Sequence, residues 1–180
     1  MRVSIKLSTF PLLAALALGG PGAFAAGYGD DKDQETVKKC PKGQVWDKAQ
    51  KKCVVPGQGS LDDDSIYAAG RALARAERYD EAIAVLSLAA DKNDPRMLNY
   101  LGFSHRKAGR VLVGLGYYQE ALRIDPNYTL VREYMGEAYL ALGDFEAAKE
   151  QLAEIEKRCG RDCPEYADLA VEILLHRQGG

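Results

Sequence analysis

Four cysteines are the residues of this chain whose chemistry depends most on how they are paired. They form two sequence-local pairs, Cys40 with Cys53 and Cys159 with Cys163. An even number of cysteines in an oxidising compartment favours disulfides, and local pairing is the natural choice among three connectivities. A redox dithiol has two intervening residues beside a βαβ unit, whereas Cys159 and Cys163 have three and no strand pattern around them. Two structural disulfides are therefore predicted, and a thiol oxidoreductase acting through Cys159 and Cys163 is kept as an alternative.

The remaining reactive side chains do not form a recognisable catalytic set. A zinc site needs four convergent ligands, and neither His105 nor His176 stands beside a cysteine. No acid or nucleophile accompanies His105, so it is interpreted as a core or groove histidine and not as a general base. Gly114-Leu115-Gly116 lacks the third glycine and the preceding strand of a dinucleotide fingerprint. The sequence predicts a protein that is not an enzyme, with no catalytic residue, metal or cofactor.

Residues 1–25 have the layout of a secretory signal peptide of the Gram-negative type. Arg2 and Lys6 precede an apolar run, and small residues lead to Ala23-Phe24-Ala25, after which cleavage is expected. The run is shorter than the roughly 20 apolar residues that span a bilayer, so no stable membrane insertion is expected after cleavage. We expect a periplasmic or secreted protein. A net charge of −2 gives no general attraction to nucleic acid.

Residues 26–62 are polar and contain few apolar side chains. Their composition predicts a disordered linker over 26–39, a disulfide-closed hairpin over 40–54, and a second linker over 55–62. Within the hairpin, Pro41 and Gly43 favour a turn, while Val45 and Trp46 favour a strand. Trp46 is expected to fill the small core of the hairpin, because such small scaffolds need an aromatic filler.

A repeat of 32 to 34 residues begins near residue 63. Gly70, Gly102 and Gly136 recur at intervals of 32 and 34. The same intervals separate two further series, Ala82, Gly114 and Ala148 and Leu86, Tyr118 and Leu152. Small residues let two helices approach closely, and a larger neighbour fills the space between them. The pattern therefore predicts three helix pairs, 63–94, 95–128 and 129–158.

The repeats resemble the tetratricopeptide repeat family. The third repeat carries the fullest match, Met135-Gly136-Glu137-Ala138-Tyr139 followed by Gly143-Asp144-Phe145-Glu146-Ala147-Ala148. The resemblance implies an all-α, right-handed solenoid of about three helix pairs, preceded by the hairpin. Residues 159–177 are predicted to form a disulfide turn and a capping helix, which covers the end of the solenoid. The second repeat departs from the pattern, because Gly114 and Gly116 each cost about 1 kcal/mol in a helix relative to alanine.

In this family the first helix of each pair lines a concave groove that binds peptides or helices of other proteins. The resemblance therefore implies an exported scaffold or adaptor protein with a protein or peptide partner. The implied groove residues are Tyr67, Arg71, Arg75, Asn99, Phe103, Arg106, Lys107, Glu133, Glu137 and Leu140. Arginine and aromatic side chains are frequent anchors of protein interfaces. A solvated charged face is the alternative interpretation.

The hairpin suggests a function of another class. Its order Cys40-Pro41, Gly43, Trp46-Asp47 and Cys53 resembles a fragment of the peritrophin-type chitin-binding module. This resemblance implies that Trp46 stacks on a sugar ring, for instance of a cell-wall glycan. An envelope glycan-binding protein is therefore the second hypothesis beside the scaffold.

Overall fold

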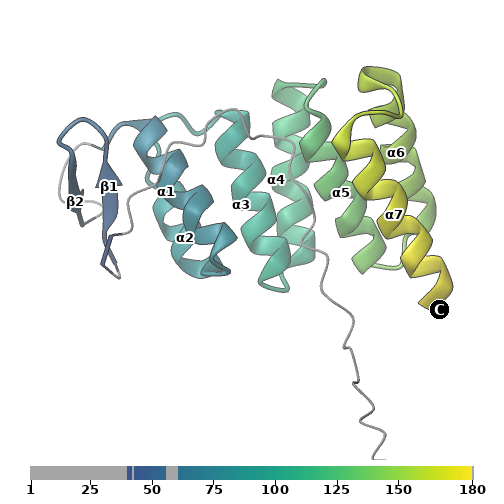
Figure 1. The fold of residues 1–180 in the computed structure, drawn as a ribbon, viewed down its shortest axis with the longest axis horizontal. Helices are drawn as coiled ribbons and strands as arrows, with labels where there is room; N and C mark the ends of the chain where they lie inside the picture. Colours follow the sequence, from purple (N-terminus) through teal and green to yellow (C-terminus); the bar gives the residue numbers. More distant parts are fainter. Residues whose placement is uncertain (1–39, 42, 56–60, 180) are drawn as a thin grey trace, which may run out of the picture.

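The computed structural model describes residues 40–41, 43–55 and 61–179. The predicted signal peptide (1–25) and linker (26–39) lie outside this range, as do residues 56–60 of the second linker. Within the described part, two short strands precede seven helices (Figure 1). The strands are β1 (Val45–Asp47) and β2 (Lys52–Val54), and the helices are α1 (Asp63–Arg75), α2 (Tyr79–Leu86), α3 (Pro95–Lys107), α4 (Val111–Ile124), α5 (Thr129–Ala141), α6 (Phe145–Cys159) and α7 (Pro164–Gly179).

The helices form the predicted solenoid, in which each pair packs against the next along the chain. α1 and α2, α3 and α4, and α5 and α6 are the three pairs, and α7 packs on both α5 and α6. None of the helices in the described ranges is long and apolar enough to cross a bilayer.

Aspartate caps and left-handed turn residues set the helix boundaries. The Asp62 side chain accepts a hydrogen bond from the backbone N–H of Ser65, and Asp94 accepts one from Arg96 at the start of α3. Such caps satisfy backbone donors that have no partner within the helix. The two helices of the third pair are joined through Gly143, which has a φ of 77°. Glu77 occupies the equivalent turn of the first pair with a φ of 58°, a conformation that favours glycine.

The glycines at the repeat spacing lie where two helices cross. A Cβ atom on Gly102 would lie 2.5 Å from Cε1 of Tyr118, whose side chain is fully buried. Gly70 faces Leu86 in the same way. In the third pair the equivalent glycine, Gly136, instead faces Leu169 of α7, 2.6 Å from its would-be Cβ. The small-and-large packing predicted from the spacing is present, and α7 takes part in it.

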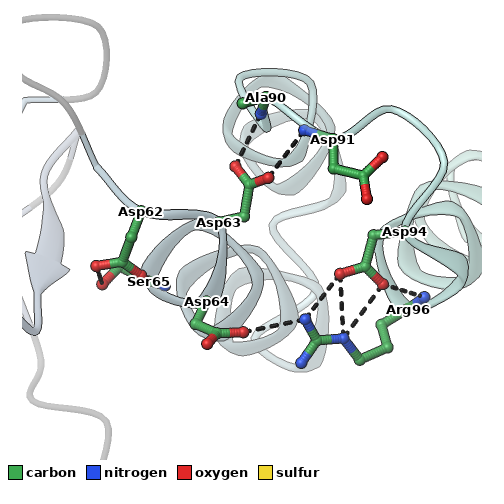
Figure 2. Close-up of polar contacts among 8 residues, drawn as sticks. All are labelled: Asp62, Asp63, Asp64, Ser65, Ala90, Asp91, Asp94 and Arg96. Atoms are coloured by element: carbon green, nitrogen blue, oxygen red, sulfur yellow. Dashed lines mark hydrogen bonds and ion pairs between the residues drawn. The ribbon is translucent and has the colours of Figure 1, made fainter.

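α2 is the shortest helix and ends at Leu86, well before Asp94. The segment that follows is held by the first turn of α1. Both carboxylate oxygens of Asp63 accept hydrogen bonds, one from the backbone N–H of Ala90 and one from that of Asp91 (Figure 2). Arg96 joins the same junction through ion pairs with Asp64 and Asp94. These contacts fix the position of α1 relative to α3.

The hairpin has the predicted disulfide and packs on α1. Cys40 is bonded to Cys53, which lies opposite Trp46 in the antiparallel register. Val45 is buried in the same core cluster as Ile66 of α1, and the backbone N–H of Lys48 donates to the Ser65 hydroxyl. Because side chains alternate along a strand, Trp46 lies on the opposite face from Val45 and is half-buried. Val45 therefore supplies the buried apolar contact with α1, and the role of Trp46 as the filler of the hairpin core stays a prediction.

Removing the hairpin disulfide is expected to loosen the hairpin without unfolding the helices. Closure of a loop of 13 residues stabilises the folded hairpin by about 3 kcal/mol on the chain-entropy model, and a lone two-stranded hairpin is marginal. The chain has one tryptophan, so the fluorescence of Trp46 reports on the hairpin. In the double variant Cys40→Ser/Cys53→Ser we expect the Trp46 transition to move to a lower urea concentration while far-UV circular dichroism is retained. The matched control, Cys159→Ser/Cys163→Ser, should leave Trp46 emission unchanged, and an equal effect of both pairs would contradict this assignment.

Candidate functional site

The first helices α1, α3, α5 and α7 are neighbours along one side of the solenoid. We call the side chains that α1, α3 and α5 place at matching positions of the repeat the inner surface. They are Tyr67, Arg71 and Arg75 on α1, Asn99, Tyr100, Phe103, Arg106 and Lys107 on α3, and Glu133, Tyr134, Glu137 and Leu140 on α5. All the groove residues predicted from the sequence belong to this set, and their partner-binding role stays a prediction.

The predicted residues differ in burial. Five side chains are buried, namely Arg71, Asn99, Arg106, Glu133 and Leu140. Tyr67, Phe103 and Glu137 are half-buried, and Arg75 and Lys107 are exposed. The buried members shape the floor of the surface, while the others are accessible to a partner.

A row of aromatic rings runs across the inner surface. The ring of Tyr67 on α1 lies 5.7 Å from that of Tyr100 on α3, which lies 6.1 Å from Phe103. Phe103 lies 5.1 Å from Tyr134 on α5. Edge-to-face and tilted ring pairs at these distances are favourable beyond the area that they bury. Tyr100 and Tyr134 were not among the predicted site residues, although their 34-residue spacing on neighbouring first helices was a signal of a shared position.

Two arginines tie this aromatic row to the helices beneath it. Nε of Arg71 donates to the hydroxyl of Tyr100 at 3.1 Å, which joins α1 to α3. Arg106 donates through Nε to the Tyr118 hydroxyl at 3.3 Å and forms an ion pair with Glu137 at 2.7 Å. Burial disfavours the charge of Arg106, but attraction to Tyr118 and Glu137 outweighs it and holds the arginine pKa above its ordinary value. Arg106 is therefore a charged, structural part of the surface.

Several buried polar atoms of the inner surface have no hydrogen-bond partner among the described residues. They include both side-chain polar atoms of Asn99, Oε1 of Glu133 and Nη2 of Arg106. Most buried polar groups in proteins are hydrogen-bonded, so each exception calls for a reason. Burial, reinforced by Glu137, Asp168 and Glu165, raises the pKa of Glu133 to about 9 against the opposing effect of Arg106. Glu133 is therefore a neutral carboxylic acid at neutral pH.

His105 packs between helices and lies apart from the aromatic row. Its ring stacks on Tyr117 at 5.3 Å, and its Nδ1 accepts a hydrogen bond from Nε of Arg110 at 2.9 Å. Burial and the charge of Arg110 lower the pKa of His105, with Asp80 acting in the opposite direction. Its contacts are those of a packing histidine.

Cys159 and Cys163 are joined by the second predicted disulfide, in the turn between α6 and α7. Together with Glu165 they are the one group of three candidate metal ligands in the described part of the chain. Metal binding requires thiolates, whereas both sulfur atoms are used in the disulfide. Gly160, with a φ of 81°, provides the turn that brings the two helices together.

Comparison with protein families finds helical repeats over most of the described residues. A family model described as a tetratricopeptide repeat matches residues 67–129, and a second model with the same description matches residues 106–173. Over 110 residues, or 60% of this chain, the sequence is 26% identical to the TPR repeat-containing thioredoxin TTL4 of Arabidopsis thaliana. The match spans only 15% of that much longer protein.

Solved structures with the same fold include peptide complexes. The first TPR of Spaghetti (RPAP3), bound to an HSP90 peptide, is 19% identical and superposes with a TM-score of 0.57, covering 67% of this chain and 94% of that chain. The Yersinia enterocolitica type III secretion chaperone SycD, in complex with a peptide of the translocator YopD, is 18% identical with a TM-score of 0.54, covering 64% of this chain and 89% of that chain. At these identities the likeness establishes the fold alone.

Proposed function

Residues 67–173 of this chain are tetratricopeptide repeats, and we propose that the protein is a scaffold that binds a segment of another protein along its inner surface. The observation that carries this proposal is the aromatic row Tyr67, Tyr100, Phe103 and Tyr134, which crosses three first helices and is bordered by charged groups. The peptides held by RPAP3 and SycD support a binding role for this fold. The proposed mechanism is reversible binding without catalysis.

We further propose that the protein acts after export, in the periplasm or outside the cell. The support is the signal-like layout of residues 1–25 together with the two disulfides, Cys40–Cys53 and Cys159–Cys163, within the described residues. Structural disulfides persist in oxidising compartments. Contact of Trp46 with a cell-wall glycan stays a prediction from the hairpin sequence.

A photo-crosslinking amino acid placed on the inner surface tests the binding proposal. Lys107 is exposed on α3, with its Nζ 5.9 Å from the centre of the Phe103 ring, so a crosslinker at position 107 lies beside the aromatic row. Lys157, exposed on the second helix α6, is the control position. We expect adducts with a defined partner at position 107 only, and mass spectrometry then identifies that partner. Adducts at position 157 alone would contradict a partner site on the inner surface.

With the purified partner, Phe103→Ala is expected to weaken binding at least tenfold. Truncating an aromatic anchor at the centre of an interface commonly has an effect of this size. Leu112→Ala is the matched control, because Leu112 is 72% exposed on the second helix α4, and it should leave the affinity unchanged. Circular dichroism of both variants checks that the helices are retained. Charge reversal at Arg71 or Arg106 is a poorer test, because both side chains are buried and their loss disturbs the fold itself.

A further inference from the structure

The surface formed by the first helices continues onto α7, where aliphatic side chains are exposed. The 34-residue interval that relates Phe103 to Glu137 leads next to Val171, and the interval from Arg106 to Leu140 leads to Leu174. α7 packs on the solenoid through Leu169 and Ile173, which are buried with Leu140 in one core cluster. The side chains of Val171, Leu174 and Leu175 are 53%, 55% and 56% exposed.

These exposures are unusual for the helix that covers the end of a solenoid. Such a helix normally turns a polar face outward, whereas three aliphatic side chains within five residues, Val171, Leu174 and Leu175, are more than half accessible here. Contiguous exposed apolar side chains commonly mark an interaction site. We call these three residues the α7 patch.

Two carboxylates precede the α7 patch along α7, on the flank of the helix near Glu133 of α5. Glu165 and Asp168 of α7 are half-buried, and both lie close enough to Glu133 of α5 to raise its pKa. No ion pair connects Glu165 or Asp168 to a cation of the described residues. Glu133 itself is only 1% exposed, and its Oε1 has no hydrogen-bond partner within that part of the chain. This end of the solenoid therefore combines exposed aliphatic surface with uncompensated negative charge.

We propose that the α5–α7 end of the inner surface binds a partner segment that carries a lysine or arginine beside aliphatic side chains. The cation lies against Glu165 and Asp168, and the aliphatic side chains cover the α7 patch. The assignment rests on the proposed function, since it places one end of the bound partner. It also gives the segment a direction, because the exposed cation Lys107 belongs to the opposite half of the surface, on α3.

Charge argues against a second copy of the chain as the occupant. Two α7 helices that pair antiparallel through the α7 patch are related by a two-fold axis, which brings like flanks of the helices together. Asp168 and Glu172 occupy the same flank of the patch, since they are four residues apart on one helix. In an antiparallel pair Glu172, which is level with the centre of the patch, would therefore approach its own copy, and like charges in an interface are unfavourable.

Three synthetic peptides of 12 residues, labelled with fluorescein and equal in length and residue order, test the proposal by fluorescence anisotropy at about 0.1 M salt. The first contains leucine and lysine, the second leucine and glutamate, and the third serine and lysine. We expect the full chain to bind the leucine–lysine peptide at least tenfold more tightly than the other two. Equal affinity for all three peptides, or no binding of any, would overturn the proposal.

Paired variants locate the binding on α7. We expect the affinity for the leucine–lysine peptide to fall at least fivefold in each of two double variants, Leu174→Ser/Leu175→Ser and Glu165→Gln/Asp168→Asn. The control pairs are Leu112→Ser/Val113→Ser at exposed residues of α4 and Glu146→Gln/Glu150→Gln at exposed residues of α6, and they should have no effect. Loss of binding in the control pairs, or none in the α7 pairs, would overturn the assignment.

Two further outcomes separate this inference from the proposed function. If the crosslinker at Lys107 captures a partner whose affinity is unchanged by Leu174→Ser/Leu175→Ser, the scaffold function stands and the assignment of the α7 patch falls. Sedimentation equilibrium of the full chain checks the other occupant. A dimer that dissociates in Leu174→Ser/Leu175→Ser would show that a second copy covers the patch and would overturn the proposal.

Discussion

The Glu133→Gln variant is expected to be more stable than the parent protein at pH 8, by roughly 2–4 kcal/mol in the free energy of unfolding. Burial and the neighbouring carboxylates hold the Glu133 pKa at about 9, far above the ordinary value of 4.5. The native state therefore keeps a proton that the unfolded chain releases. Between about pH 4.5 and pH 9 the native state binds more protons than the unfolded state, so stability falls as the pH rises. A glutamine has no proton to lose and should abolish this slope.

Urea unfolding at several pH values between 5 and 9 measures this effect. At pH 5 the parent protein and Glu133→Gln should be close in stability, and the two curves should diverge as the pH increases. Four groups set the field at Glu133, namely Glu137 on its own helix, Asp168 and Glu165 on α7, and Arg106 on α3. Parallel curves for the two proteins would show that Glu133 titrates normally in the native state.

Glu137→Gln is the matched control for this substitution and should have the opposite sign. Glu137 lies one helical turn after Glu133, but it forms an ion pair with buried Arg106 at 2.7 Å. Removing one partner of a buried pair leaves the other charge uncompensated, which commonly costs about 3–5 kcal/mol. Because Glu137 is itself only half-buried, we expect a loss nearer to about 2 kcal/mol. The same chemical change at neighbouring turns of α5 thus distinguishes a carboxyl group that lowers the free energy of unfolding from one that raises it.

Alanine substitutions at Gly114 and Gly116 are expected to change stability in opposite directions. A Cβ atom on Gly114 would lie 2.7 Å from the backbone oxygen of Gly102 and 3.1 Å from Cβ of Arg106. Since backbone cannot move aside as a flexible side chain can, Gly114→Ala should lower the free energy of unfolding by about 1–3 kcal/mol despite its better helix propensity. A Cβ on Gly116 would meet nothing within 4 Å, so Gly116→Ala should raise it by up to about 1 kcal/mol.

Chemical denaturation of the two glycine variants, followed by far-UV circular dichroism, measures both changes under one set of conditions. The two glycines lie two positions apart in α4, and both are changed to alanine. The two variants therefore have the same chain length and charge, and nearly the same distance from the ends of the helix. Equal stabilisation by both alanines would mean that α3 and α4 cross with more space than the contact between Gly102 and Gly114 allows. On the expected result, the second repeat is closely packed at Gly114, and Gly116 lowers stability only through its poor helix propensity.

The repeat spacing was sufficient to predict the helix pairs because each pair buries a stripe of fixed period. Gly70, Gly102 and Gly136 mark that period in the sequence, and each lies at a helix crossing in the structure. The short α2 was not predicted, and neither was the position of the segment that follows it, which Asp63 holds by accepting hydrogen bonds from the backbone of Ala90 and Asp91. Ala90 and Asp91 lie 27 and 28 positions after Asp63, and a local sequence pattern carries no information about such a contact.

For the candidate site, the sequence determined which helix carries each side chain, but not how buried that side chain is or whether it is ionised. The resemblance to the tetratricopeptide repeat family assigned Tyr67, Phe103 and Lys107 to the surface of the first helices. Whether a carboxyl group at one of these positions is ionised depends on burial and on charges brought from other helices. Glu133 and Glu137 are both glutamates at groove positions of α5, yet one is buried beside other carboxylates and the other faces Arg106.

The sequence by itself determined the three helix pairs, through the small residues that recur every 32 to 34 positions, and the two local disulfides. Only the tertiary structure decided which of the assigned residues support the surface and which are open to a partner. It also showed that α7, expected simply to cover the end of the solenoid, exposes Val171, Leu174 and Leu175. The physical reason is that helix periodicity is a local property, whereas burial and electrostatic field are sums over neighbours that lie far apart in the chain.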